Sequence, residues 1–359
     1  MSVAARQSRV SALLPGLDVE ALLVTSAENC RYLAGFAASN AAFVAADSPL
    51  YVTDSRYATA VAEQCRDLEV VLDRDAAAGA VRAAARAGVT RLGFEAHAVT
   101  VADQRRLDEI ARVAGITLIA VGQVVEPLRA IKDDEEIEHL KEACVVTERA
   151  LARVVAEVRV GLTERWLAAR LEFLMCEEGA EAAGFPSIVA TGDSSAEPHH
   201  EPTDREVCAG DLLKIDCGAR VRGYHADMTR TYVVGRPAHT WQTEIHELVG
   251  QAAAAGRAAV APGVALVAID RASRDVIDGA GHALHFGHGL GHGIGLEIHE
   301  APMIGPSATG TLCENMTVTV EPGIYLPGLG GVRIEDSLVV TSDGATSLTS
   351  TNRELLVLG

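Results

Sequence analysis

An internal repeat in the second half of the sequence constrains the fold more than any other feature. Apolar spacing predicts two helices followed by a β-hairpin, and the same order then returns. The predicted elements are helices over about 133–159 and 163–179, a hairpin of residues 211–219 and 224–234, helices over about 241–260 and 265–279, and a hairpin of residues 316–325 and 331–340. Such a repeat predicts a pseudo-twofold α+β domain with a functional site between its two halves.

The first third of the chain has a different pattern, in which short apolar runs alternate with helical spacing. The predicted strands cover residues 21–26, 41–46, 50–53, 68–72, 91–94 and 116–120, and the predicted helices lie near 55–65, 76–87 and 100–113. This alternation is typical of an α/β layer. Pro127 then interrupts the pattern, because proline disfavours helix in the residue before it. We therefore expect an α/β domain over residues 1–128 and a second domain over residues 129–359.

Charge and cysteine content exclude several classes of function. The 359-residue chain has a formal charge of −18, which disfavours binding to nucleic-acid phosphates or to anionic membranes. No apolar run approaches the ~18 residues that span a bilayer, and Met1–Pro15 lacks the apolar stretch of a signal peptide. The seven cysteines are scattered and form no CxxC pair, as expected for reduced thiols. We expect a cytoplasmic protein without nucleic-acid or membrane partners.

Four acidic residues stand out because each lies within a predicted strand, where such residues are unfavourable. They are Asp216, Asp227, Glu321 and Glu335, one on each strand of the two predicted hairpins. The spacing repeats, since 105 residues separate Asp216 from Glu321 and 108 separate Asp227 from Glu335. Side chains alternate along a strand, so the four acids would share one polar face of the sheet. The opposite face would carry apolar residues, namely Val318, Val320, Ile334 and Leu338.

Four clustered carboxylates repel one another, which raises their pKa values unless cations balance the charge. Two divalent cations would cancel the four negative charges, and a neutral histidine would join such a site without changing the sum. The nearest source of imidazoles is segment 281–300, which contains His282, His285, His288, His292 and His299. Its many glycines disfavour a helix and allow close approach of the backbone to a ligand. Any one of these residues alone is more often a solvated surface group, so it is their combination that indicates a metal site.

Several segments resemble the signature segments of the aminopeptidase P / prolidase family. In the second half they read LLKIDCGARVRGYHADMTRTYVV, FGHGLGHGIGLEIHE, TVEPGIY and GVRIEDSLVV, with PHHEPTDR at 198–205 similar to the short histidine segment of the family. NCRYLAGFAASNAAFVA and YVTDSRY resemble its N-terminal creatinase-type domain. The resemblance covers essentially the whole chain and is nearest in character to bacterial Xaa-Pro dipeptidase-like proteins. It implies a metallopeptidase of the pita-bread fold that cleaves the Xaa-Pro bond at the N-terminus of dipeptides or short peptides.

The resemblance also implies five metal ligands, and all five positions are intact in this sequence. Asp216 would bind one metal ion, and Asp227 and Glu335 would bridge two ions. His292 and Glu321 would bind the second ion. Because the donors are mostly oxygen, the expected cofactor is a pair of divalent ions, with Mn²⁺ favoured and Co²⁺ or Zn²⁺ as alternatives.

Catalytic and substrate-binding roles follow from the same resemblance. Glu321 would take a proton from a water that bridges the two ions and later deliver it, and the resulting hydroxide would attack the scissile carbonyl. His299 would stabilise the developing oxyanion, and His199 and His288 would contact and orient the substrate. The expected catalytic residues are therefore Glu321, His299 and His199. Arg333 joins the three histidines in the expected substrate-binding set and would hold the carboxylates.

One position departs from the family pattern, and other functions stay open. Some dipeptide-cleaving members carry an arginine for the substrate carboxylate at the position of Met303. Its absence here favours longer peptides without excluding a dipeptidase. The resemblance also implies a homodimer that acts on short proline-containing peptides. Two alternatives remain, a hydrolase of a non-peptide amide or amidine on the same fold and a non-catalytic peptide-binding protein.

Overall fold

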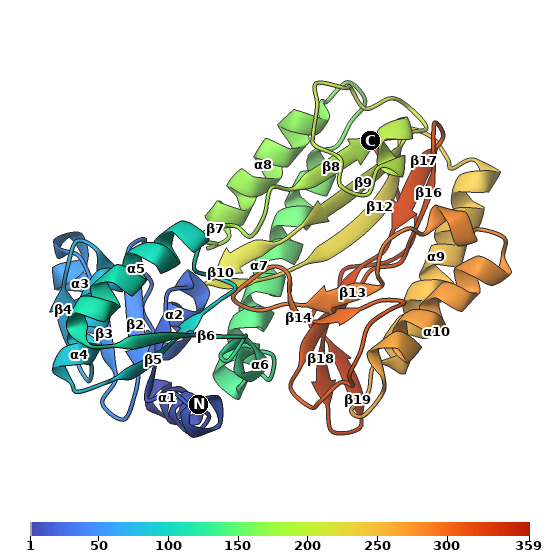
Figure 1. The fold of residues 1–359 in the computed structure, drawn as a ribbon. Coiled ribbons are helices and arrows are strands. Elements are labelled where there is room, and N and C mark those ends of the chain that lie inside the picture. Colours follow the sequence, from blue (N-terminus) through green and yellow to red (C-terminus); the bar gives the residue numbers. More distant parts are fainter. Residues whose placement is uncertain (1) are drawn as a thin grey trace. The chain divides into compact units, whose positions relative to one another are not determined.

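The computed structural model describes residues 2–359, and the chain divides into two compact units (Figure 1). The first unit ends at Arg129 and the second begins at Ala130. Each unit has a buried apolar core of its own. Among residues 2–359, no helix combines the length and the apolar character needed to cross a membrane. All seven cysteines are free, as the sequence predicts.

The N-terminal unit is built on a six-stranded mixed sheet, and all six predicted strands are confirmed. In chain order they are β1 Ala21–Val24, β2 Ala41–Ala45, β3 Leu50–Thr53, β4 Glu69–Leu72, β5 Arg91–Glu95 and β6 Thr117–Val121. Across the sheet they lie in the order β4-β3-β2-β1-β5-β6. Strand β1 pairs parallel with β5 and antiparallel with β2, so the sheet mixes both kinds of ladder.

Six helices accompany this sheet in the described residues, and three of them, α1, α2 and α6, are absent from the sequence prediction. They are α1 Val3–Ser11, α2 Ala27–Ala34, α3 Ala58–Gln64, α4 Ala76–Arg86, α5 Val101–Ala114 and α6 Glu126–Arg129, with 3-10 turns η1 Leu14–Leu17 and η2 Ser55–Tyr57. Helices α3, α4 and α5 confirm the predicted ones. Helices α1 and α2 span little more than two turns each, too few for a clear apolar period.

The first half of the second unit contains the predicted pair of helices and the predicted hairpin. Its elements are α7 Asp134–Glu157, α8 Glu164–Glu177, β7 Ala182–Ala183, β8 Ile188–Thr191, η3 Gly192–Ala196, β9 Leu212–Cys217, β10 Ala219–Val221, β11 Tyr224–His225 and β12 Met228–Val234. A capping box between Asp133 and Glu136 starts α7, and the Thr163 side chain caps α8. Strands β9 and β12 pair antiparallel, with Thr229 opposite Asp216.

The second half repeats this order. Its elements are α9 Thr240–Ala259, α10 Leu266–Gly279, η4 Ala283–His285, β13 Gly291–Gly293, β14 Glu300–Ile304, β15 Thr317–Val320, β16 Gly323–Leu326, β17 Gly330–Arg333, β18 Asp336–Thr341, β19 Gly344–Ser347 and β20 Val357–Leu358. In each half an additional strand, which the sequence does not predict, pairs beside the hairpin. Strand β8 extends β9 in the first half, and β13 extends β15 in the second.

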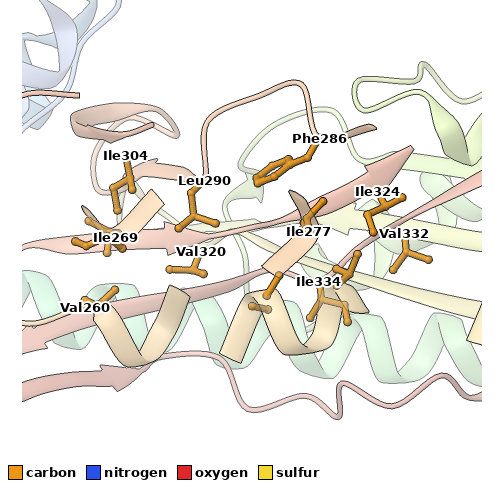
Figure 2. Close-up of a cluster of buried hydrophobic side chains, with 14 of the residues drawn as sticks. Val260, Ile269, Ile277, Phe286, Leu290, Ile304, Val320, Ile324, Val332 and Ile334 are labelled. Carbon is orange, nitrogen blue, oxygen red and sulfur yellow. The ribbon is translucent and has the colours of Figure 1, made fainter. Parts of the chain in front are cut away.

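The strands of the second unit lie between its two pairs of helices (Figure 1). One sheet has the order β20-β12-β9-β8 and another has the order β14-β13-β15-β18-β19. Apolar side chains of α9, α10 and the second hairpin belong to one buried cluster, in which Figure 2 labels Ile269 and Ile277 of α10 together with Val320 and Ile334. The four residues predicted for the apolar face, Val318, Val320, Ile334 and Leu338, all belong to this core. Its burial is the main source of stability for the sheet that carries the polar face.

One prediction about the hairpins is wrong, because only Asp216 lies within a strand. Asp227 lies in the gap before β12, Glu321 follows β15, and Glu335 lies between β17 and β18. Pro322 has no backbone N–H to continue the ladder, so the second hairpin divides into the pairs β15–β18 and β16–β17. The carboxylates at these breaks lie outside the regular alternation of a strand. The backbone therefore directs them toward one point from several elements.

Glycines at two positions allow the strands around these acids to approach closely. A Cβ at Gly291 would lie 2.0 Å from the carbonyl oxygen of Thr319, and a Cβ at Gly218 would lie 1.7 Å from that of Ala226. Both contacts involve backbone atoms, so no side-chain rotation can relieve them. Gly291 immediately precedes His292. The imidazole therefore reaches its position only because the backbone at Gly291 packs closely against β15.

Replacing Gly291 with alanine is expected to destabilise the protein by about 3 kcal/mol, because the methyl group overlaps the β15 backbone. The matched control is Gly287→Ala in the same segment, where a Cβ meets nothing within 4 Å. We expect that control to keep wild-type stability or to gain slightly from the stiffer unfolded chain. Urea unfolding monitored by circular dichroism measures both, and equal stabilities of the two variants would contradict the packing argument.

Candidate metal centre

Carboxylates from four segments meet one imidazole at the centre of the second unit. The Nε2 atom of His292 lies 3.5 Å from Oδ2 of Asp227 and 3.4 Å from Oε1 of Glu321. One ligand atom each from Asp227, His292 and Glu335 lie within 4.8 Å of one another. The sequence analysis expects these residues to converge although Asp227 and Glu335 are 108 positions apart, and the structure places them together.

Hydrogen bonds from the sheet fix two of the carboxylates. The hydroxyl of Thr229 donates to Oε2 of Glu335 at 2.6 Å, and that of Thr319 lies 3.4 Å from Oε1 of Glu321. Thr319 also accepts a bond from the backbone N–H of His292 at 3.1 Å. Threonines of both hairpins thus orient candidate ligand residues of the second half, a role that the sequence analysis does not assign to them.

The ring of His292 presents a lone pair to the acids. Its Nδ1 atom lies 3.0 Å from the carbonyl oxygen of Gly293, which can only accept a hydrogen bond. This contact assigns the ring proton to Nδ1 and leaves Nε2 unprotonated in the neutral ring. Nε2 is the atom that faces Asp227 and Glu321, so His292 is oriented as a metal ligand.

Three of the acids, Asp227, Glu321 and Glu335, are poorly tolerated as anions in this environment. Burial, reinforced by the neighbouring Asp216 and Glu321, raises the pKa of Asp227 well above its usual value. Burial and the charge of Asp227 do the same to the pKa of Glu335. Burial also raises the pKa of Glu321. A bound cation reverses this preference, because it favours the charged form of every carboxylate that it contacts.

One oxygen of Asp216 supplies a direct test of whether the donor set fits a metal. Its Oδ2 atom receives a hydrogen bond from Arg333, whereas its Oδ1 atom is buried without any hydrogen-bond partner. An unpartnered buried carboxylate oxygen is costly unless a ligand satisfies it. Together with the free Nε2 atom of His292, this oxygen makes a donor set of oxygen and one nitrogen that fits divalent cations.

Arg333 lies beside the acids, and all three nitrogens of its guanidinium bind protein groups. Its Nε donates to Thr229 at 3.0 Å, and Nη1 donates to the Tyr325 hydroxyl at 2.9 Å and to the Pro198 carbonyl at 3.1 Å. The remaining nitrogen binds Asp216. The side chain is 3% exposed. Arg333 therefore braces a carboxylate, as predicted, while its guanidinium is already occupied by protein groups.

The three other predicted histidines all line a cavity of ≈ 1090 Å³ above the acids. The ring of His299 packs edge-on against that of His292, with centroids 4.4 Å apart. Nε2 of His288 lies 2.9 Å from the Tyr325 hydroxyl, and His199 projects into the cavity as an exposed residue. Burial lowers the pKa of His288 to about 4 and, aided by His292, also lowers the pKa of His299. Both rings are therefore neutral at physiological pH.

Two histidines of the glycine-rich segment lie apart from this centre. His282 and His285 approach each other, with their Nδ1 atoms 3.2 Å apart, and neither lines the cavity. Met303 does line it and is 55% exposed. Tyr325, which the sequence analysis does not single out, links His288 to Arg333. Its signal was present in the TVEPGIY segment, where it follows Glu321 by four residues.

A second group of metal-type side chains, Glu95, His97 and Glu126, occurs in the N-terminal unit. The Asn29 side chain donates to both carboxylates at 2.6 Å, and His97 lies 2.8 Å from Glu126. Glu95 also accepts the backbone N–H of Ser26 at 2.9 Å, at the start of α2. These bonds make the group a hydrogen-bonded support for α2.

Family comparisons agree with this arrangement of domains and residues. Residues 138–342 match the model of metallopeptidase family M24, and residues 6–131 match that of the creatinase/prolidase N-terminal domain. The chain is 34% identical over 343 residues to the Xaa-Pro dipeptidase of Pyrococcus horikoshii, covering 94% of this chain and 95% of that protein.

Solved structures of similar proteins share the fold over nearly their whole length. The Xaa-Pro dipeptidase from Bacillus anthracis superposes with a TM-score of 0.95 at 34% identity, covering 99% of this chain and 100% of that one. The X-Pro aminopeptidase from Thermotoga maritima gives a TM-score of 0.88 at 34% identity, with coverages of 96% and 99%. These similarities confirm the predicted α+β pita-bread architecture. The chain belongs to metallopeptidase family M24 and is a metal-dependent peptidase with a creatinase/prolidase N-terminal domain.

Proposed function

We propose that this protein hydrolyses the Xaa-Pro bond at the N-terminus of short peptides, using two divalent metal ions. The observation that carries the proposal is the convergence of four acids and the free Nε2 atom of His292 beneath a cavity lined by His199, His288 and His299. The ligands would be Asp216, Asp227, His292, Glu321 and Glu335. When bound, divalent ions polarise a carbonyl and lower the pKa of water from ~15.7 toward neutrality.

Glu321 is the acid best suited to move a proton. Its side chain is 18% exposed toward the cavity, against 6% for Asp227 and 11% for Asp216. Burial raises the pKa of Glu321 toward neutral pH, so this carboxyl group can take up and release a proton more readily than an ordinary glutamate. We therefore assign to Glu321 the removal of a proton from the attacking water and its delivery to the leaving nitrogen.

The cavity histidines provide hydrogen bonds for the substrate. His299 packs against the ligand His292, which sets it beside the point where the scissile carbonyl would lie. As a neutral imidazole it can donate one N–H to the developing oxyanion. His288 is anchored by Tyr325, and His199 projects freely into the cavity, so both are placed to orient the peptide.

The charges that line the cavity bear on the length of the substrate. Among its described lining residues, Arg333 is the one permanent cation, and protein groups occupy its guanidinium. Met303 contributes an apolar rim. A dipeptide would bring its C-terminal carboxylate into this cavity without a free cation to pair with, whereas a longer peptide carries that charge farther away. We propose that peptides longer than two residues are good substrates. Both a dipeptidase and an aminopeptidase occur among the similar proteins.

Three finer points stay predictions from the sequence, namely Mn²⁺ as the native metal, a homodimer, and a cytoplasmic location. The functional alternatives are hydrolysis of a non-peptide amide or amidine and peptide binding without turnover. The experiments below separate these alternatives, because they measure metal content, bond specificity and turnover independently.

A peptide panel with defined metal content tests the proposal. We expect the purified chain to bind about two ions per molecule, to lose turnover on chelation, and to regain it with Mn²⁺. Xaa-Pro-Yaa tripeptides should be cleaved with a higher kcat/KM than Xaa-Pro dipeptides. Matched peptides with alanine in place of proline serve as controls. Equal cleavage of those controls would contradict proline specificity, and metal binding without turnover of any peptide would support a binding protein.

Two substitutions should separate metal binding from oxyanion stabilisation. His299→Ala is expected to keep both metal ions and to lower kcat about 100-fold, which corresponds to one lost donor of ~3 kcal/mol. Asp227→Asn is expected to lose metal and nearly all activity, because an amide is a weaker bridging ligand than a carboxylate. Metal analysis and steady-state kinetics of both variants test the assignment. An unchanged kcat in His299→Ala would remove His299 from the reaction.

Metal binding should strengthen as the pH rises. Asp227 and Glu335 have folded-state pKa values above those of the unfolded chain. Their contribution to the stability of the metal-free protein is therefore complete at low pH and is lost as pH rises through the folded values. A bound cation replaces these protons and restores the stability that is lost when the acids ionise. The rise in Tm caused by Mn²⁺ should therefore be larger at about pH 8 than at about pH 5. Differential scanning calorimetry measures it, and a pH-independent rise would contradict the coupling.

A further inference from the structure

His199 depends on its backbone for its position in the cavity. It follows η3 in a segment without regular secondary structure, and its side chain is exposed. Within residues 2–359, no hydrogen bond or ion pair holds its ring, in contrast to His288 and His292. A side chain placed in this way can orient a ligand only if the chain that carries it is fixed by other groups.

Lys214 holds the backbone of the segment that precedes His199. It lies on β9, two residues before Asp216, and its side chain is fully buried. Its Nζ atom donates to the backbone carbonyls of Ser195 at 3.2 Å, Glu197 at 2.5 Å and Pro198 at 3.5 Å. Among the described residues no carboxylate lies within 4.0 Å of this amine. The lysine therefore binds the backbone of the histidine segment and nothing that would neutralise its charge.

The other end of the same segment is tied to helix α8. The fully buried Glu164 accepts hydrogen bonds from the backbone and the hydroxyl of Thr203, at 3.0 and 2.7 Å, and lies 2.8 Å from Nε2 of His200. Arg333 adds a second cationic donor to the Pro198 carbonyl. His199 is thus the free residue between two anchored flanks, and the Lys214 contacts lie on its N-terminal side.

The three carbonyl contacts suit a lysine better than an arginine at this position. The sequence has 28 arginines but only three lysines, at 132, 141 and 214. A planar guanidinium cannot converge three donors on one small arc of carbonyls as a tetrahedral ammonium does. Burial and the charge of Arg333 lower the pKa of Lys214 well below its usual value. The protonated amine offers three N–H donors and the neutral amine two, so both forms can bind these carbonyls.

We propose that Lys214 is a positioning residue that sets His199 in the substrate cavity by holding the backbone of residues 195–198. It does not touch the substrate and does not bind metal. The inference deepens the proposed function, because it names the group on which one substrate-orienting histidine depends. Its structural part, the ordering of the segment by Lys214, holds whatever peptide the cavity accepts.

Hydrogen exchange and kinetics of Lys214→Met test the proposal together. Methionine keeps an unbranched side chain of similar length but cannot donate to carbonyls. We expect faster amide exchange in residues 195–203, with unchanged exchange in β12 and in α9, and an unchanged metal content. On an Xaa-Pro-Yaa tripeptide, kcat/KM should fall by about 10- to 100-fold. If methionine prevents folding, Lys214→Gln is used, which retains one donor group and should show the same pattern more weakly.

A double-mutant cycle distinguishes positioning of His199 from a general loss of structure. In a His199→Ala background, Lys214→Met should lower kcat/KM by less than about 3-fold, because the histidine that it positions is gone. An equal loss in both backgrounds would overturn the proposal, and so would unchanged exchange in residues 195–203. The matched control is Lys141→Met, an exposed lysine paired with Glu138 on α7, which should leave exchange and kinetics at wild-type values.

The two proposals fail in different ways. Absence of turnover on every proline peptide by the wild-type protein would overturn the proposed function, while the exchange measurement would still decide the role of Lys214. Turnover by the wild type with additive effects of Lys214→Met and His199→Ala would overturn only the positioning role.

Discussion

Mutual repulsion among buried carboxylates governs the second unit of this protein. Asp227 and Glu335 are almost completely buried, and their neighbours carry the same charge, so burial and charge act in the same direction on both. A folded chain tolerates such an arrangement only when other interactions hold the acids in place. Here the apolar cluster of α9, α10 and the second hairpin supplies that rigidity, and Arg333, paired with Asp216, supplies a positive charge beside the acids. Bound divalent cations would balance the remaining negative charge.

The backbone devices around the site serve the same end. Glycines at 218 and 291 let strands approach more closely than any side chain would permit, and Pro322 ends a ladder directly after Glu321. Each device departs from regular sheet structure, and each lies within two residues of a carboxylate or imidazole of the centre. Such departures are typical of functional sites, where regular structure gives way to the geometry of a ligand.

Much of this arrangement could be predicted from the sequence, because alternation and repetition are local properties. The recurrence of helix, helix and hairpin was readable from apolar spacing, and so was the apolar face of Val318, Val320 and Leu338. Strand β13 could not be predicted, because a run of glycines gives no β signal and because its pairing with β15 depends on residues farther along the chain. The sequence analysis placed Glu321 within a strand, although Pro322, which cannot donate to a sheet ladder, indicates that the strand ends there. The contacts of Lys214 could not be predicted, because they join a strand to the carbonyls of an irregular segment.

The division of the ligands between the two structural repeats has a consequence for how such a centre can persist. Of the proposed ligands, Asp216 and Asp227 come from the first repeat and His292, Glu321 and Glu335 come from the second, and Thr229 of the first donates to Glu335 of the second. Neither repeat alone contains a complete coordination sphere. A change that loosened the contact between the two repeats would therefore separate the proposed ligands and weaken cation binding.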